Sequence, residues 1–158
     1  AQALLNDPQL LIVDEPTAGL DPEERIRFRN LLADLGGDRT VLLSTHIVED
    51  IAQTCQQLAV MNRGQVIFQG PVTDLLRQAE GYVWSLTTMA GARPGGNLTI
   101  VSTVNQGGVI QYRVVGEPEE VAQLAPNAQR VEPGLEDGYV WLMREQRQPS
   151  QPFAGLRA

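Results

Sequence analysis

Two adjacent carboxylates, Asp14 and Glu15, directly follow an unbroken apolar run at residues 10–13. A short apolar run that ends at turn residues is typical of a strand buried on both faces of a parallel sheet. Ligands of parallel α/β sheets gather where the strands end. An aspartate at such a strand end can hold Mg²⁺, and a neighbouring carboxylate can polarise an attacking water. Taken alone, the pair also fits an ordinary polar turn after a buried strand.

The only histidine, His46, occupies a similar position after a second predicted strand at residues 40–44. An imidazole in this position can bridge a phosphate oxygen and a carboxylate. A lone histidine after a strand is more often a surface or capping residue. The residues around Asp14 therefore decide between the two interpretations.

Helices and strands alternate in the part of the chain that must position these side chains. Asp21 is a good N-cap for a helix that starts at Pro22, and Glu24 completes a capping box. An apolar stripe should bury one face of this helix: Phe28, Leu31, Leu32 and Leu35. A second helix after His46 carries another stripe: Ile47, Ile51 and Cys55. The order strand, helix, strand, helix predicts a parallel α/β layer, followed by a hairpin at residues 58–68 and a short helix that ends at Ala79.

The chain changes character after Gly81, where β-branched and aromatic residues become frequent. We expect a first domain at residues 1–80, a small α+β subdomain at 81–146 and a disordered tail at 147–158. The subdomain should contain a hairpin of residues 98–104 and 109–115, helices at 118–125 and 135–144, and a strand at 128–131. Its aromatic residues can form either its core or a partner-binding surface: Tyr82, Trp84, Tyr139 and Trp141.

The strings LLIVDEPTAGLDP and TVLLSTHIVEDI resemble the second half of an ABC transporter ATP-binding subunit. The resemblance is close over residues 1–80. It implies a partial P-loop NTPase-type parallel sheet with helices, followed by the small α+β subdomain. The trailing pattern at residues 133–137, Pro-Gly-Leu-Glu-Asp, resembles bacterial exporters of the ABC-2 type more loosely.

The resemblance also implies roles for individual residues. Asp14 corresponds to the Walker B aspartate, which binds Mg²⁺ through water, and Glu15 to the catalytic glutamate. Asp21 corresponds to the D-loop aspartate, which crosses the dimer interface to the opposite nucleotide site. His46 corresponds to the switch histidine that contacts the γ-phosphate of ATP. The implied partners are a transmembrane permease and a second ATP-binding subunit, at the cytoplasmic face of the cell membrane.

The 158-residue sequence contains twelve arginines and no lysine, so it cannot hold a P-loop in its usual form. A Leu-Ser-Gly-Gly signature is also absent from the sequence. We therefore expect a C-terminal fragment of an ATP-hydrolysing export subunit that is inactive alone.

The net charge of −7 argues against direct nucleic-acid binding. No apolar run approaches the roughly 20 residues of a membrane helix, so direct membrane insertion is not expected. Two alternatives stay open: a non-transport ABC ATPase of DNA repair or translation, and a fragment that acts only as a binding or regulatory module.

Overall fold

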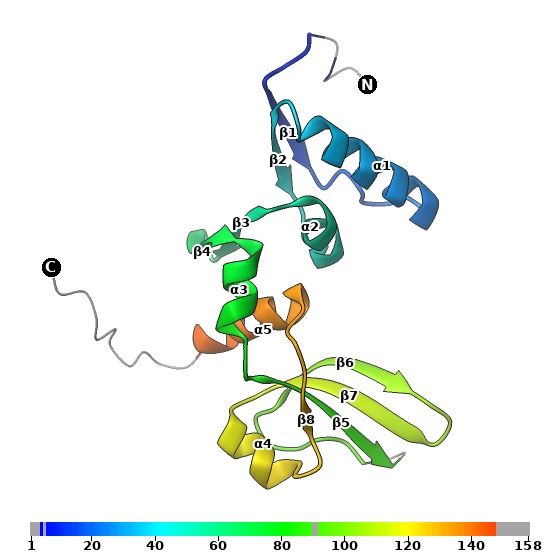
Figure 1. Ribbon diagram of the computed structural model, residues 1–158, viewed down its shortest axis with the longest axis vertical. Helices are drawn as coiled ribbons and strands as arrows, with labels where there is room; N and C mark the ends of the chain where they lie inside the picture. The colour runs from blue at the N-terminus through cyan, green and yellow to red at the C-terminus, as the bar shows by residue number, and fades with distance from the viewer. Residues whose placement is uncertain (1–3, 5, 90–91, 148–158) are drawn as a thin grey trace, which may run out of the picture. The chain divides into compact units, whose positions relative to one another are not determined.

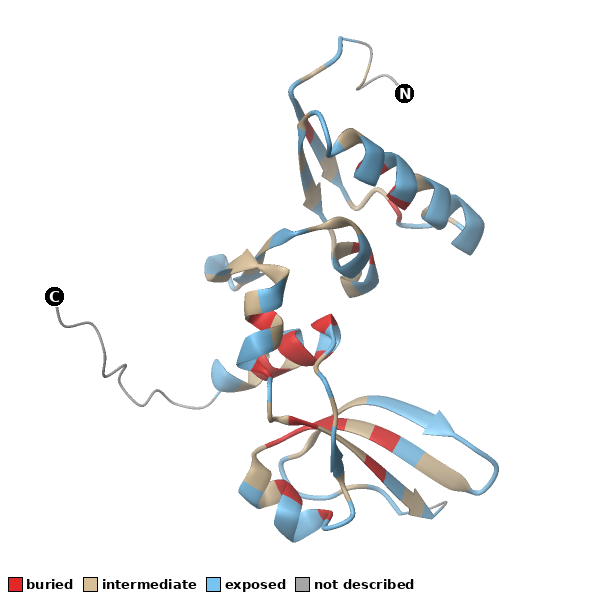
Figure 2. Ribbon diagram, in the orientation of Figure 1, coloured by how far each residue is buried: buried red, intermediate tan, exposed pale blue. Residues whose placement is uncertain are grey.

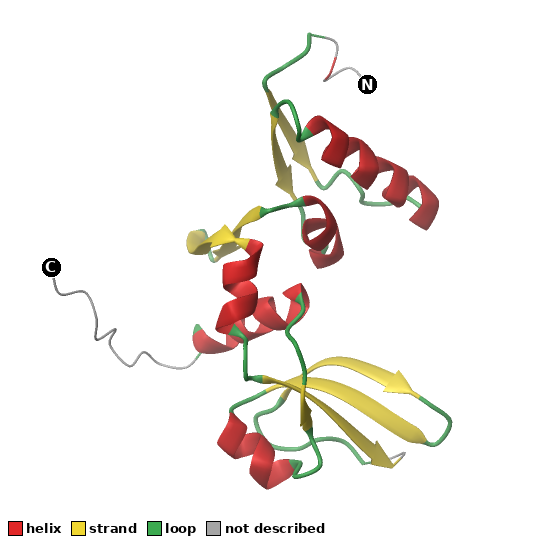
Figure 3. Ribbon diagram, viewed as in Figure 1, coloured by secondary structure: helices red, strands yellow, loops and turns green. Residues whose placement is uncertain are grey.

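The computed structural model describes residues 4, 6–89 and 92–147, which fall into two compact units divided between Val72 and Thr73. The fold is mixed α/β, with helices and strands in both units (Figures 1 and 3). Apart from Arg147, the predicted disordered tail lies outside the described residues.

The first unit begins with two parallel strands joined by a helical crossover. Strands β1 (Leu10–Asp14) and β2 (Thr40–Ser44) pair in register from Leu10 opposite Thr40 to Asp14 opposite Ser44. Helix α1 (Pro22–Leu35) connects them, and helix α2 (Val48–Thr54) follows β2. The predicted start of α1 is confirmed, because Asp21 accepts a hydrogen bond from the Glu24 amide at 2.9 Å. All four elements lie close to their predicted positions.

The prediction that β1 is buried on both faces is wrong for the described residues. Leu11 is 6% exposed, whereas Leu10 and Ile12 on the opposite face are 53% and 64% exposed. Leu42, the partner of Ile12 on β2, is 57% exposed. Side chains alternate across a strand, so one face of the pair is at least partly covered and the other is open within the part of the chain that the structure describes. Figure 2 accordingly colours both strands mainly as exposed or intermediate.

The predicted buried stripes of the two helices also need correction. In α1 the buried residues are Arg29 and Leu32, while Leu31 is 44% exposed. In α2 the buried residue is Asp50, and the apolar side chains around it are only partly covered. A buried arginine and a buried aspartate on facing helices explain the difference, because each offsets the charge of the other.

An antiparallel hairpin completes the first unit. Its strands are β3 (Gln57–Asn62) and β4 (Gln65–Pro71). The turn residues Arg63 and Gly64 both have positive φ, at 50° and 78°. Two central residues with positive φ match the twist of the flanking strands, so the predicted tight turn is confirmed.

The second unit is a four-stranded antiparallel sheet with three helices. Its strands are ordered β6-β7-β5-β8. The strands are β5 (Val83–Met89), β6 (Thr99–Asn105), β7 (Val109–Val115) and β8 (Gln129–Arg130). The helices are α3 (Val72–Gln78), α4 (Pro118–Leu124) and α5 (Leu135–Glu145). The predicted hairpin and helices of this subdomain are therefore confirmed.

Helix α3 belongs with the second unit, although we expected it in the first domain. Its Leu75 is 1% exposed and lies against Gly138 of α5. Ala79, just after α3, joins a core cluster with Val83 and Trp141. These contacts group α3 from Thr73 onward with the second unit, whereas the sequence placed the change of character near Gly81.

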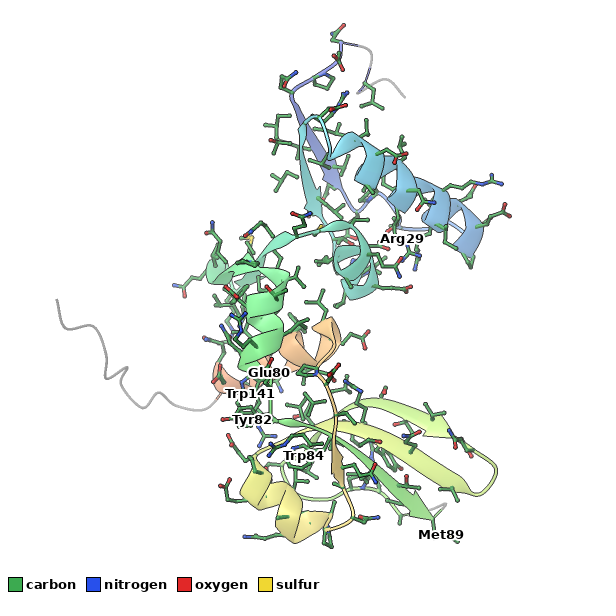
Figure 4. The ribbon with its side chains drawn as sticks, in the orientation of Figure 1. Arg29, Glu80, Tyr82, Trp84, Met89 and Trp141 are labelled. Atoms are coloured by element: carbon green, nitrogen blue, oxygen red, sulfur yellow. The ribbon has the colours of Figure 1, made fainter. Side chains whose placement is uncertain are left out.

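The aromatic residues of the second unit mainly form core. The rings of Tyr82 and Trp141 stack with centroids 3.9 Å apart, and Trp141 is 5% exposed (Figure 4). The indole N–H of Trp84 donates to the Gly116 carbonyl at 3.1 Å. Tyr139 alone is substantially exposed, at 40%. The core interpretation therefore describes this set better than a continuous partner-binding surface.

A buried ion pair ties β7 to α5 in the second unit. Arg113 donates from Nε and Nη2 to the Asp137 carboxylate at 2.7–2.9 Å, and Asp137 is 1% exposed. The same carboxylate accepts a hydrogen bond from the Gly134 amide at 2.6 Å. The hydrogen bonds to Asp137 raise the pKa of the Arg113 guanidinium above its ordinary value. This pair gives the Pro-Gly-Leu-Glu-Asp pattern a structural function.

Candidate functional site

The parallel pairing of β1 and β2 brings Glu15 and His46 together. Asp14 is the last residue of β1 and lies opposite Ser44, the last residue of β2. The Glu15 amide continues the ladder by donating to the Ser44 carbonyl at 2.7 Å. The side chains of Glu15 and His46 therefore lie at the edge where the two strands end, as the sequence predicted.

The Glu15 carboxylate binds the segment after β2 through several groups. Its Oε1 lies 2.8 Å from His46 Nδ1 and accepts a hydrogen bond from the His46 amide at 3.0 Å. Its Oε2 accepts a longer hydrogen bond from the Thr45 hydroxyl at 3.4 Å. The Glu15 side chain is 34% exposed and that of His46 is 78% exposed. The pair is thus oriented by the backbone and is still accessible to water and to a ligand.

The backbone of Glu15 is strained. Its φ of +44° lies in the left-handed region, which is costly for a residue with a side chain. The strain is held by a tight turn, in which the Ala18 amide donates to the Glu15 carbonyl at 3.1 Å. Strained residues of this kind cluster at functional sites, where the surrounding structure fixes a side chain in a required direction.

The other two predicted site residues lie at separate positions. Asp14 is exposed at the end of β1. Asp21 is exposed and caps α1 through its bond to the Glu24 amide. Its role in the fold is therefore helix capping, and its role at a dimer interface stays a prediction.

The single carboxylate of Asp14 fits a Mg²⁺ ion that takes most of its ligands from water and phosphate. Among the described residues, no cluster of three or more histidine, cysteine, aspartate or glutamate side chains could form a protein cage for a metal. Mg²⁺ usually binds through one or two carboxylates, several waters and the phosphates of its substrate. One exposed carboxylate at a strand end suits that arrangement.

Sequence reasoning missed several polar residues beside this pair. Thr45 contacts Glu15 directly, and a buried cluster behind the turn contains Thr17, Arg29 and Asp50. The signal for Asp50 was present, because it lies three residues after Ile47 and one residue before Ile51, on the side of the helix predicted to be buried.

None of the helices in the described ranges is long and apolar enough to cross a membrane. No protein-family model matches the sequence.

Similarity to curated proteins covers about half of the chain. An uncharacterized ABC transporter ATP-binding protein of Bacillus subtilis is 37% identical over 87 residues, which are 55% of this chain and 30% of that protein. A similar protein of Synechocystis is 37% identical over 83 residues, 52% of this chain and 23% of that protein. Nod factor export ATP-binding protein I of Rhizobium johnstonii is 46% identical over 85 residues, 51% of this chain and 26% of that protein.

The matched region thus spans between about a quarter and a third of the length of these relatives. The homologues of this chain are ABC transporter ATP-binding proteins, including proteins of Nod factor export.

Proposed function

We propose that this chain supplies the water-activating and switching residues of an ATP-hydrolysing subunit that drives export across a membrane. The observation that carries the proposal is the contact between Glu15 and His46, with 2.8 Å between Oε1 and Nδ1. The similarity to ABC transporter ATP-binding proteins supports ATP as the substrate.

The proposed chemistry assigns a separate task to each side chain. Glu15 accepts a proton from the attacking water, because its carboxylate is oriented by the His46 amide and Thr45 and is still open to solvent. The imidazole of His46 holds Glu15 with one nitrogen and has the other available for a phosphate oxygen. Asp14 would hold Mg²⁺ through water, and the metal would supply neutralisation of phosphate charge.

The proposal also includes the wider architecture. The β1–β2 pair would form part of a P-loop NTPase-type parallel sheet, and Asp21 would contact a second ATP-binding subunit. A permease would receive the work of hydrolysis at the cytoplasmic face of the membrane. Such a site needs a lysine that binds the phosphates, and this sequence contains no lysine. A chain segment outside this sequence would have to supply it. For this reason the chain alone is expected to be inactive.

The magnesium dependence of ATP hydrolysis tests the proposal. In the full-length gene product, Asp14→Asn should raise the magnesium concentration needed for half-maximal turnover by about 10- to 100-fold, as expected for the loss of a group that binds the metal through water. The measurement is phosphate release at saturating ATP across a magnesium titration.

Asp38→Asn is the matched control, because Asp38 is an exposed aspartate in the connection between α1 and β2. Its magnesium dependence should equal that of the wild type. Absence of ATP hydrolysis by the full-length product, or identical titrations for Asp14→Asn and the wild type, would contradict the proposal.

A further inference from the structure

A buried polar cluster lies behind the candidate site and has no part in the chemistry proposed above. Thr17 and Asp50 are each 1% exposed, and Arg29 is 8% exposed. The three residues come from the turn after β1, from α2 and from α1. Polar groups buried to this extent are costly unless they are paired.

The shortest contact in this cluster joins Thr17 to Asp50. The Thr17 hydroxyl donates to Asp50 Oδ2 at 2.5 Å. Arg29 Nη1 is farther away, at 3.6 Å from Asp50 Oδ1 and 3.3 Å from the Glu49 carboxylate. Asp50 Oδ1 and Arg29 Nη1 have no hydrogen-bond partner among the described residues. Arg29 thus offsets the charge of Asp50, while Thr17 fixes its position.

This contact links the same two chain segments as the candidate site. Thr17 lies two residues after Glu15, and Asp50 lies four residues after His46. Asp50 is the third residue of α2, which begins at Val48, and its amide donates to the Ile47 carbonyl at 3.1 Å. Asp50 is therefore tied to the residue that directly follows His46. The Thr54 hydroxyl donates to the Asp50 carbonyl at 2.6 Å, which holds Asp50 to the following turn of α2.

The two contacts differ in what protects them. The Glu15–His46 pair is exposed to solvent, where an ion pair or hydrogen bond is weak. The Thr17–Asp50 bond is buried, where a broken bond leaves an unsatisfied carboxylate. The buried bond is therefore better able to determine the spacing of the two segments.

We propose that Asp50 is a positioning residue which, through Thr17 and with Arg29, sets the approach of His46 to Glu15. The proposal deepens the proposed function and rests on it for its catalytic meaning. Loss of the Thr17 hydroxyl releases the turn that carries Glu15 from α2. The imidazole of His46 then loses its fixed partner at Nδ1.

The single histidine of the sequence provides a direct test on this chain. A hydrogen bond from Nδ1–H to Glu15 Oε1 favours the Nδ1–H tautomer of the neutral ring. The ¹⁵N chemical shifts of the two ring nitrogens, measured without nucleotide in alkaline buffer, report the ratio of the tautomers. The wild type should show an excess of the Nδ1–H form.

Thr17→Val removes the hydroxyl and retains the shape of the side chain. It should lower the ratio of Nδ1–H to Nε2–H roughly fivefold, the equilibrium change expected for the loss of one ordinary hydrogen bond. Thr17→Ser should restore the wild-type ratio. Asp50→Asn, which replaces the carboxylate by a weaker acceptor, should change the ratio in the same direction and by less.

Thr40→Val is the matched control, because Thr40 is an exposed threonine at the start of β2. It should leave the ratio unchanged. A wild-type ratio in Thr17→Val, an equal effect of Thr40→Val, or no Nδ1–H excess in the wild type would overturn the proposal. If Thr17→Val unfolds the first unit, a lower ratio of Nδ1–H to Nε2–H in Asp50→Asn than in Thr17→Ser supports the proposal. Equal ratios in these two variants overturn it.

The tautomer measurement separates this proposal from the proposed function. Since no nucleotide is present, a shifted ratio supports the positioning role even if the full-length product does not hydrolyse ATP. Conversely, magnesium-dependent hydrolysis with an unchanged ratio in Thr17→Val would support the proposed function and overturn the positioning role.

Discussion

Glu15→Gln in the full-length gene product should slow ATP hydrolysis by about 10²- to 10⁴-fold, the range for loss of a general base. Glutamine has nearly the shape of glutamate and still offers an oxygen to the His46 amide. It cannot accept the proton of the attacking water. Nucleotide binding should therefore persist while turnover is lost, which is measured by comparing kcat with the dissociation constant for MgATP.

Glu23→Gln provides the control for this substitution. Glu23 lies on the exposed side of α1, where it pairs with Arg27 at 2.5 Å and both side chains are about three-quarters exposed. Surface pairs of this kind contribute little. Turnover should equal that of the wild type in Glu23→Gln. Full turnover in Glu15→Gln would remove Glu15 from the proposed mechanism.

Asp137→Ala should destabilise the second unit by about 3 kcal/mol, at the lower end of the range for breaking a buried ion pair. The substitution leaves the Arg113 guanidinium without its carboxylate and the Gly134 amide without its acceptor. The lower end applies because the Arg113 side chain is 32% exposed and can turn partly to water. Urea unfolding followed by tryptophan fluorescence measures the loss, since Trp84 and Trp141 both lie in this unit.

A second aspartate of the same unit serves as the reference for this measurement. Asp74 pairs with Arg77 on α3 at 2.8 Å, with side chains that are 46% and 68% exposed. Asp74→Ala should cost at most about 1 kcal/mol, as for other surface pairs. An equal decrease in the free energy of unfolding for Asp74→Ala and Asp137→Ala would show that burial of the Arg113–Asp137 pair contributes nothing to stability.

Local patterns predicted the elements well because they depend on neighbouring residues. The cap at Asp21, the turn at Arg63 and Gly64, and the hairpin of β6 and β7 are all set within a few positions of the chain. The order of the elements also placed Glu15 and His46 at the same edge, since parallel strands end together.

Burial was predicted less well because it depends on residues far away in the sequence. The apolar run of β1 indicated two covered faces, yet Ile12 is 64% exposed. The apolar pattern of α1 predicted that Leu31 is buried. In the structure Arg29 is buried instead, close to Asp50 of the neighbouring helix α2. A charged residue is compatible with a buried position only when its partner is known, and that partner comes from another element.

The open face of the β1–β2 pair affects how easily these two strands separate from each other. A two-stranded sheet that packs on one side only has few apolar contacts to lose when it separates, so local opening there costs little free energy. The core cluster that contains Val83 and Trp141 is buried, and it should become exposed to solvent only when the whole second unit unfolds. Amide hydrogens of β1 and β2 should accordingly exchange with solvent well before those of β5 and β7.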